Sequence, residues 1–207
     1  MHIVDGALSM PVLVAGSAIA VAGIGIGLKQ MPIEKIPAAG VLSATFFVAS
    51  LVHVPIGPSS VHLIVNGLAG LVLGWAAFPA LFVALLLQAV FFGFGGLTVL
   101  GVNTVDIALP AVAVHYLCRP GIVRGSPQVA AIWGAIGGAL AIALTTVCVG
   151  VALAFSGEGF VAAAKLVFVA HLPVMAIEGV LSGAAIHLAR RVKPELFEAF
   201  SPRPQGA

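Results

Sequence analysis

The chain has 207 residues, of which 61% are hydrophobic and only 8% charged, and its formal net charge is +2. Because soluble domains carry about a quarter charged residues, this composition excludes a soluble globular protein. It predicts an all-α polytopic membrane protein in contact with membrane lipids, and the scattered basic residues indicate no nucleic-acid partner.

The first feature in chain order is the opening Met1-His2-Ile3-Val4-Asp5. No basic stretch and cleavage site follow it, so we expect no signal peptide and a retained Met1. The Met1 α-amine, the deprotonated His2 amide and His2 Nδ1 would then close fused five- and six-membered chelate rings in one plane. Such planar nitrogen donors suit Ni²⁺ or Cu²⁺, and Co²⁺ can also use them. A Met-His start also arises by chance, so the rest of the chain has to support this hypothesis.

Seven apolar stretches follow, each a candidate to cross a ~30 Å hydrocarbon core, which takes about 20 residues. They cover residues 10–28, 36–54, 60–78, 80–100, 103–118, 128–155 and 160–189. Pro110 and Pro173 lie inside two of these spans and should kink them. We therefore expect one transmembrane helical domain over 1–190, whose N-terminal metal-binding segment is 1–9, and a short cytoplasmic tail over 191–207.

Basic residues predict the orientation of these spans. With seven spans, eight of the nine basic residues fall on one face, which should be cytoplasmic. They are Lys29, Lys35, Arg119, Arg124, Arg190, Arg191, Lys193 and Arg203. The C-terminus is then inside, and Met1-His2 is outside, where it could fold inward into the bundle.

Two histidines at the expected outer ends of spans could supply a fourth nitrogen, His53 and His62, and spacing leaves both open. An imidazole Nε2 would bind the ion at ~2 Å while a backbone carbonyl or a hydroxyl holds the other ring nitrogen. Ser59 and Ser60 are candidates for such a hydroxyl. Because imidazoles must be unprotonated to bind, affinity should fall below about pH 6.5.

Other polar residues inside the spans are functional candidates by default. His171 and Glu178 are seven residues apart and share a helical face, so they could form a polar relay or a structural pair. Four more are expected to hydrogen-bond between spans and could hold the N-terminal segment in place. These are Asn66, Gln88, Asn103 and Asp106.

Several catalytic motifs are missing from the sequence. It contains no GxxxxGK[ST], HExxH or GxSxG, so we expect no nucleotide site of its own and no hydrolase activity. We therefore expect that the chain is not an enzyme.

Four segments together resemble one family. Met1-His-Ile-Val-Asp-Gly-Ala-Leu8, Gly57-Pro-Ser-Ser-Val-His-Leu63, Gln88-Ala-Val-Phe-Phe-Gly-Phe-Gly-Gly96 and His171-Leu-Pro173 with Glu178-Gly179 are similar to motifs of the CbiM/NikM family. These proteins are the substrate-binding membrane components of energy-coupling-factor (ECF) ABC transporters for cobalt and nickel. The resemblance implies that Met1, His2 and His62 bind the ion and that no cofactor is needed beyond the transported Ni²⁺ or Co²⁺.

The resemblance also implies partners and a location. The partners would be an ECF transmembrane coupling subunit, ATP-binding cassette ATPase subunits and in some systems a small accessory membrane subunit, in the bacterial inner membrane. Phe94 and Asp106 depart from the family pattern, which leaves the choice between cobalt and nickel open.

Two other functions compete with this one. A stand-alone secondary transporter or channel would use His171 and Glu178 as a proton relay. A haem-binding membrane redox protein is a more remote alternative, because His53 and His62 lie too close to the expected span ends.

Overall fold

Prolines mark the first turns of several helices, where the missing N–H of proline breaks no hydrogen bond. The computed structural model describes residues 2–51, 53–56, 59–157 and 161–198. In these ranges the elements are, in order, α1 (Met10–Lys29), the 3-10 turn η1 (Ile33–Lys35), α2 (Ile36–Ala49), β1 (His53–Ile56), β2 (Ser59–His62), α3 (Asn66–Leu73), the 3-10 turn η2 (Gly74–Ala76), α4 (Ala77–Phe92), α5 (Leu100–Arg124), α6 (Pro127–Ala154), α7 (Val161–Ala170), α8 (Leu172–Val192) and α9 (Glu195–Glu198). Proline stands in the first turn of α1, α2, α6 and α8.

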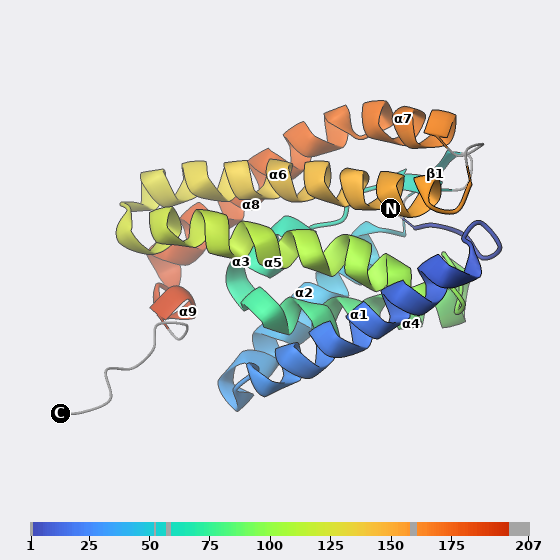
Figure 1. The fold of residues 1–207 in the computed structure, drawn as a ribbon. Coiled ribbons are helices and arrows are strands. Elements are labelled where there is room, and N and C mark those ends of the chain that lie inside the picture. The colour runs from blue at the N-terminus through green and yellow to red at the C-terminus, as the bar shows by residue number, and fades with distance from the viewer. Residues whose placement is uncertain (1, 52, 57–58, 158–160, 199–207) are drawn as a thin grey trace.

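The helices form an elongated bundle, which confirms the all-α polytopic class (Figure 1). Within the described residues, five stretches are long and apolar enough to cross a membrane. They are Met10–Lys29, Asn66–Phe92, Leu100–Arg124, Pro127–Ala154 and Leu172–Val192. The count of seven spans and the placement of the termini across a membrane stay predictions.

The stretch 66–92 does not run straight, because the chain reverses direction at Gly74. α3 follows α5 away from the N-terminal segment, with Asn66 bonded to the Ile107 carbonyl and Gly70 packed on the Ala111 main chain. α4 then returns to the N-terminal segment. Gly74 has φ +59° and lies against the His115 ring, so this tight turn needs a residue without Cβ.

Two expected spans are wrong in their boundaries. The span expected over 36–54 ends as a helix at Ala49, and the one over 60–78 begins as the strand β2 and contains only eight helical residues before Gly74. Between them, β1 and β2 form an antiparallel hairpin in which His53 pairs with His62. Pro55 is compatible with this hairpin, because proline is tolerated in the edge strands of a two-stranded sheet.

The last expected span, 160–189, is broken rather than merely kinked. α7 ends at Ala170 and α8 begins at Leu172, so Pro173 stands in the first turn of a new helix instead of inside an old one. Pro110 and Pro120, in contrast, lie within the unbroken helix α5.

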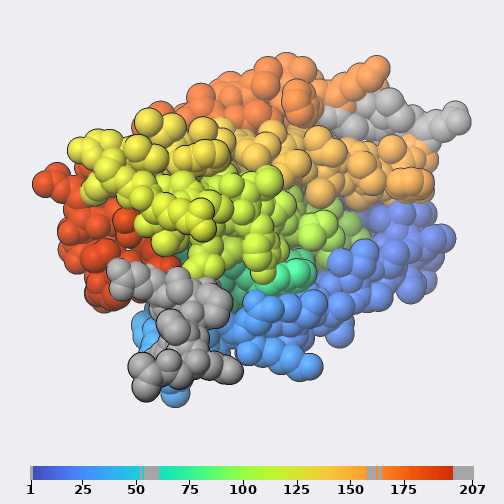
Figure 2. Space-filling model, turned by 60° about the vertical axis from the view of Figure 1, so that its left-hand side comes forward, coloured from blue at the N-terminus to red at the C-terminus, as the bar shows by residue number. Residues whose placement is uncertain are grey.

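The two ends of the bundle differ in character. At one end lie the N-terminal segment, the β-hairpin and the loop between α4 and α5, and at the other lie the α5–α6 turn, the end of α8 and α9 (Figure 1). Figure 2 turns this second end forward, where the colours of the α5–α6 turn and the end of α8 meet. Arg190 there donates to the carbonyls of Val123 and Gly125, both at 3.3 Å, and Arg119 donates to that of Phe197 at 3.5 Å. The described basic residues thus gather opposite the N-terminal segment, except Lys165; Arg203 lies outside the described residues.

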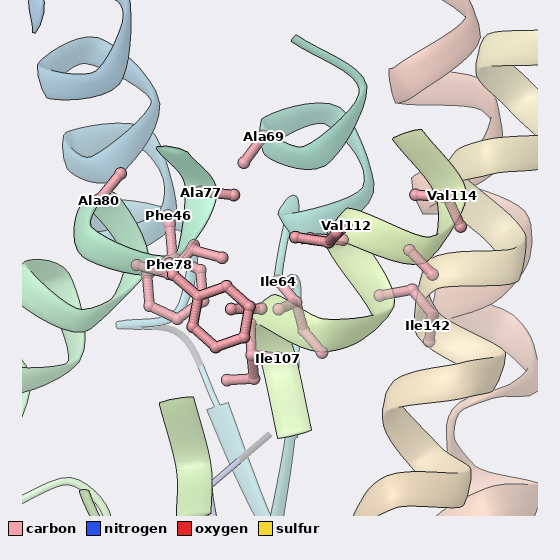
Figure 3. Close-up of a cluster of buried hydrophobic side chains, with 14 of the residues drawn as sticks. Phe46, Ile64, Ala69, Ala77, Phe78, Ala80, Ile107, Val112, Val114 and Ile142 are labelled. Atoms are coloured by element: carbon pink, nitrogen blue, oxygen red, sulfur yellow. The ribbon is translucent and has the colours of Figure 1, made fainter. Parts of the chain in front are cut away.

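One part of the hydrophobic core lies between α2, α3, α4 and α5, and the core continues into α6 and α8. Figure 3 shows Ile64 and Phe78 directed into one interior space beside Ile107, and none of the three is more than 1% exposed. Ile64 comes from the extended segment just before α3, so burying its side chain also fixes the end of the strand that carries His62.

Replacing Gly70 by alanine should destabilise the bundle, because an added Cβ would overlap the Ala111 main chain. Overpacking of this kind costs about 1–3 kcal/mol, which would lower the thermal midpoint of the purified protein in detergent. Gly25→Ala is the matched control, since a Cβ there meets nothing within 4 Å. Equal midpoints for the two variants would contradict this packing.

Candidate metal centre

The N-terminal segment is held in the bundle by hydrogen bonds of its main chain and of the Asp5 side chain. Ile3 N–H donates to Asn103 Oδ1 at 2.9 Å, and Asn103 Nδ2 donates back to the Ile3 carbonyl at 3.0 Å. Asp5 N–H donates to the Gly95 carbonyl at 2.9 Å, and Thr98 Oγ1 donates to Asp5 Oδ1 at 2.5 Å. The segment is thus held by the loop between α4 and α5 and by the first turn of α5.

That loop can approach the segment because it is rich in glycine. Gly95 has φ +74°, and a Cβ on it would lie 2.8 Å from Asn103 Nδ2 and 3.5 Å from His2 Cβ. Any side chain would therefore push apart the very bonds that hold residues 2–5.

Gln88 fixes the protonation of the His2 ring. Its Nε2 donates to the Phe47 carbonyl at 3.2 Å and to Ser50 Oγ, whose own hydroxyl donates to the Phe46 carbonyl at 2.7 Å. Carbonyl oxygens only accept, so Gln88 must turn its Oε1 toward His2, where it accepts from Nε2–H at 2.8 Å. A neutral His2 therefore carries its proton on Nε2 and a lone pair on Nδ1.

His62 has the opposite tautomer for the same reason. Its Nδ1 lies 2.7 Å from the Leu63 carbonyl, and because that oxygen only accepts, Nδ1 carries the proton. The Nε2 lone pair then faces His2 Nδ1, and the two nitrogens are 3.1 Å apart. The rings lie side by side, with centroids 4.8 Å apart and planes inclined at 30°.

Two converging lone pairs repel each other unless a cation lies between them. Adjacent donors of a planar four-coordinate ion with bonds of about 2.0 Å stand about 2.8 Å apart, close to the distance observed here. Either a metal ion or a shared proton between the two nitrogens would satisfy the pair. The separation is therefore compatible with a metal ion bound by both rings.

Burial keeps both rings neutral. Each is only 4% exposed, and burial lowers the pKa of His2 and of His62 to about 4. The bond to Gln88 partly opposes this shift of the His2 pKa and His53 adds to it, while for the His62 pKa the Leu63 carbonyl opposes burial and His171 adds to it. The protonation step expected near pH 6.5 thus moves down to about pH 4 in the folded, metal-free protein.

Of the two histidines left open by the sequence, the structure brings His62 into direct contact with His2. The expectation that the partner histidine is borne on a helix is wrong, because His62 lies on β2. His53 instead makes an edge-to-face contact with Phe94, with centroids 4.3 Å apart, and its Nδ1 lies 3.3 Å from the Leu51 carbonyl. Met1 and the side chains of Ser59 and Ser60 lie outside the described residues.

Side chains alone do not complete a metal site here. Among the residues that the structure describes, no three His, Cys, Asp or Glu side chains come together in a group that could hold an ion. A metal centre at His2 and His62 therefore has to draw further donors from elsewhere, such as main-chain nitrogens. The roles of Met1, His2 and His62 as ligands stay predictions.

The other predicted polar residues divide into two groups. Gln88 and Asn103 do hold the N-terminal segment, whereas Asn66 joins α3 to Ile107 of α5 and Thr145 of α6. Asp106 does neither in the described structure, and its Oδ2 is buried without a hydrogen-bond partner there.

Sequence reasoning missed two features of this centre. It did not pair Gln88 with His2, although a glutamine seven residues before the Gly95-Gly96 pair was part of a recognised motif. It also missed Phe94, which lies over the His2 ring with centroids 6.4 Å apart and joins an aromatic cover with Phe92 and His53. No signal in a single sequence could have shown this cover.

Comparison with known proteins relates the chain to metal transporters. A protein of Haemophilus influenzae named a putative metal transport protein is 42% identical over 95% of this chain and 96% of its own length. The cobalt transport protein CbiM of Sorangium cellulosum is 28% identical over 96% and 95%. A solved structure of a transition metal transporter superposes with a TM-score of 0.71 at 27% identity and covers both chains completely.

The fold and these similarities define a multi-pass membrane protein of transition-metal transport. The family model described as the cobalt uptake substrate-specific transmembrane region, CbiM, matches residues 2–196. The chain belongs to the CbiM family.

The two tautomers can be observed directly. In metal-free protein labelled with ¹⁵N-histidine, we expect the proton on Nε2 for His2 and on Nδ1 for His62 in long-range ¹H–¹⁵N spectra at neutral pH. Gln88→Met should release the His2 tautomer, because it removes the acceptor at 2.8 Å, while Gln30→Met at the opposite end of the bundle should change neither ring. An unchanged His2 spectrum in Gln88→Met would contradict the assignment.

The same spectra give the pH dependence. Since both folded-state pKa values are about 4, below the ordinary 6.5, His2 and His62 should stay neutral at pH 5 while an unfolded chain protonates near 6.5. Their burial therefore favours the folded state above about pH 6.5, and this contribution is lost as the pH falls through about 4. Titration of both rings near pH 6.5 would show that they are not buried as described.

Proposed function

We propose that this chain captures Ni²⁺ or Co²⁺ as the substrate-binding membrane subunit of an ECF-type ABC importer. The observation that carries the proposal is the pair of ring nitrogens, His2 Nδ1 and His62 Nε2, whose lone pairs converge at 3.1 Å with both tautomers fixed by acceptor-only groups. The metal-transport names of the relatives support the choice of a transition metal.

The remaining donors would come from the main chain. The Met1 α-amine and the deprotonated His2 amide precede His2 Nδ1, so the three nitrogens form fused five- and six-membered rings in one plane. His62 Nε2 takes the fourth position beside Nδ1. This requires Met1 to be the first residue of the mature protein, which the intact mass of the purified chain checks.

A planar nitrogen site gives selectivity through geometry. Zn²⁺ prefers a tetrahedral arrangement and would bind poorly, whereas Cu²⁺ lies higher in the affinity order and is not rejected by geometry. Binding displaces the protons of the amine and the amide, so affinity should still depend on pH even though both imidazoles are neutral above about pH 5.

Energy for transport would come from partners, since the sequence holds no P-loop. The proposed partners are a transmembrane coupling subunit, ATP-binding cassette ATPases and a small accessory membrane subunit. The gathering of basic residues opposite His2 supports an orientation with the metal centre on the outer side of the bacterial inner membrane.

The competing functions predict different behaviour. A channel or secondary transporter would carry metal without ATPase subunits, so uptake that depends on those subunits supports the importer. A haem between His2 and His62 would need ligands on opposite sides of one iron, about 4 Å apart, which is more than the 3.1 Å found here.

The decisive measurement is metal binding by titration of purified variants. His2→Ala, His62→Ala and a chain extended by two alanines before Met1 should each bind Ni²⁺ at least about 100-fold more weakly, beyond the loss typical of outer-shell changes. The extension tests the amine specifically, because it moves the terminal nitrogen two residues further from His2.

Two histidine variants serve as controls for this titration. His187→Ala should bind normally, because that ring is bonded to the Pro127 carbonyl at the opposite end of the bundle. His53→Ala tests the other histidine left open by the sequence and should change binding little. Undiminished affinity in both His2→Ala and the extended chain would refute the proposed coordination.

A further inference from the structure

Glu178 joins α8 to the segment that carries His62. Its side chain is fully buried, and Oε1 accepts two hydrogen bonds, from Ile64 N–H at 2.6 Å and from Val65 N–H at 2.8 Å. Both donors belong to the short connection between β2 and α3, which lies outside any helix or strand. One carboxylate oxygen therefore accepts hydrogen bonds from two main-chain N–H groups that belong to no helix or strand.

The connection between β2 and α3 needs these two hydrogen bonds because its backbone is strained. Val65 has φ +56° and is the one non-glycine with positive φ among the described residues. A β-branched residue in the left-handed region is strongly disfavoured, and it persists only where the surroundings hold it. Here Val65 caps the start of α3, and Glu178 is bonded to its N–H.

The residues that Glu178 holds, Ile64 and Val65, follow His62 closely in the chain. Residues 62 to 65 span about 10 Å when extended, and the seven residues from His171 to Glu178 span about the same length along a helix. His171 is close enough to His62 to affect its pKa, and Glu178 contacts Val65. The segment from His62 to Val65 therefore has Glu178 of α8 bonded at its far end, while His171, the residue before α8, lies in the neighbourhood of His62.

We propose that Glu178 is a positioning residue for metal capture: its carboxylate oxygen holds Ile64 and Val65 in the conformation that aims His62 Nε2 at His2 Nδ1. This inference rests on the proposed function, since it assigns Glu178 a task in that same site. It also makes α8, 114 residues away in sequence from Ile64, part of the support of the metal centre.

What positions the segment is the reach of the side chain, not its charge. Glutamine keeps an oxygen at the same distance and can accept both hydrogen bonds, whereas aspartate keeps the charge but draws the carboxylate back by about 1.5 Å. If Glu178 instead bound the ion transiently during transport, its negative charge would be required and the length of its side chain would matter less. Glu178 Oε2 is buried without a hydrogen-bond partner in the described structure, so the experiment has to distinguish ion binding by Glu178 from positioning of the segment.

The test is Ni²⁺ titration of Glu178→Gln and Glu178→Asp beside the wild type, with size-exclusion profiles and thermal midpoints recorded for each. Glu178→Gln should bind within about threefold of the wild type. Glu178→Asp should bind about 10- to 100-fold more weakly, the loss typical when a residue supporting a metal ligand is removed. Weak binding by Glu178→Gln, or normal binding by Glu178→Asp, overturns the proposal.

A double variant shows whether the effect acts through His62. If Glu178 only positions this ring, Glu178→Asp should cause no further loss in a His62→Ala background; additive losses indicate a general structural role and overturn the proposal. If His62→Ala itself binds normally, the proposed coordination fails, whereas a weak His62→Ala with a normal Glu178→Asp refutes the positioning role alone.

The wild-type chain provides a check that does not depend on any variant folding. The Ile64 and Val65 amides should exchange with deuterium as slowly as helix-core amides, although they lie outside regular elements, because both donate to a buried oxygen. Rapid exchange of both amides would overturn the proposal.

Discussion

Two neutral imidazoles buried with their lone pairs converging form the constraint on which the rest of this structure depends. Leaving such a pair in an apolar bundle costs free energy unless each outer nitrogen has an acceptor and the inner pair can take a cation. The acceptors are supplied by Gln88 for His2 and by the Leu63 carbonyl for His62. Gln88, on α4, is held in turn by the end of α2. Both helices therefore orient the His2 ring, while the chain just after β2 orients the His62 ring.

The irregular backbone of the protein is concentrated where this constraint requires it. The hairpin, the connection 63–65 and the loop 93–99 all lie at the end of the bundle that holds His2, while the long helices supply the rigid walls. Main-chain groups outside helices are costly in an apolar setting, and here side chains and neighbouring main chain accept or donate in place of the missing helical bonds. Asn103 does so for Ile3 and Glu178 for Val65.

The sequence predicted the class of fold and singled out His2 and His62, but for different physical reasons. Composition and the lengths of apolar stretches sufficed for a helical membrane protein, because the bilayer sets the length of a span. His2 and His62 were singled out by chemistry and by a family resemblance, and the structure places their rings in contact.

What the sequence could not show depends on contacts between distant residues. Hydropathy does not distinguish an apolar strand followed by a short helix from a full span, so the hairpin and the reversal at Gly74 were missed. The partnership of Gln88 with His2 and that of Glu178 with Val65 join residues 86 and 113 positions apart, and a single sequence carries no record of such pairs.

The long distances in sequence between these contacting residues affect when the centre can form during synthesis of the protein. The ring of residue 2 is oriented by residue 88, and the strand bearing residue 62 is held by residue 178 on the last long helix. A nascent chain therefore has no assembled centre until α8 has been synthesised and packed. The contact between the two rings would therefore become fixed in one late step of folding, after the N-terminal and C-terminal parts of the chain have met.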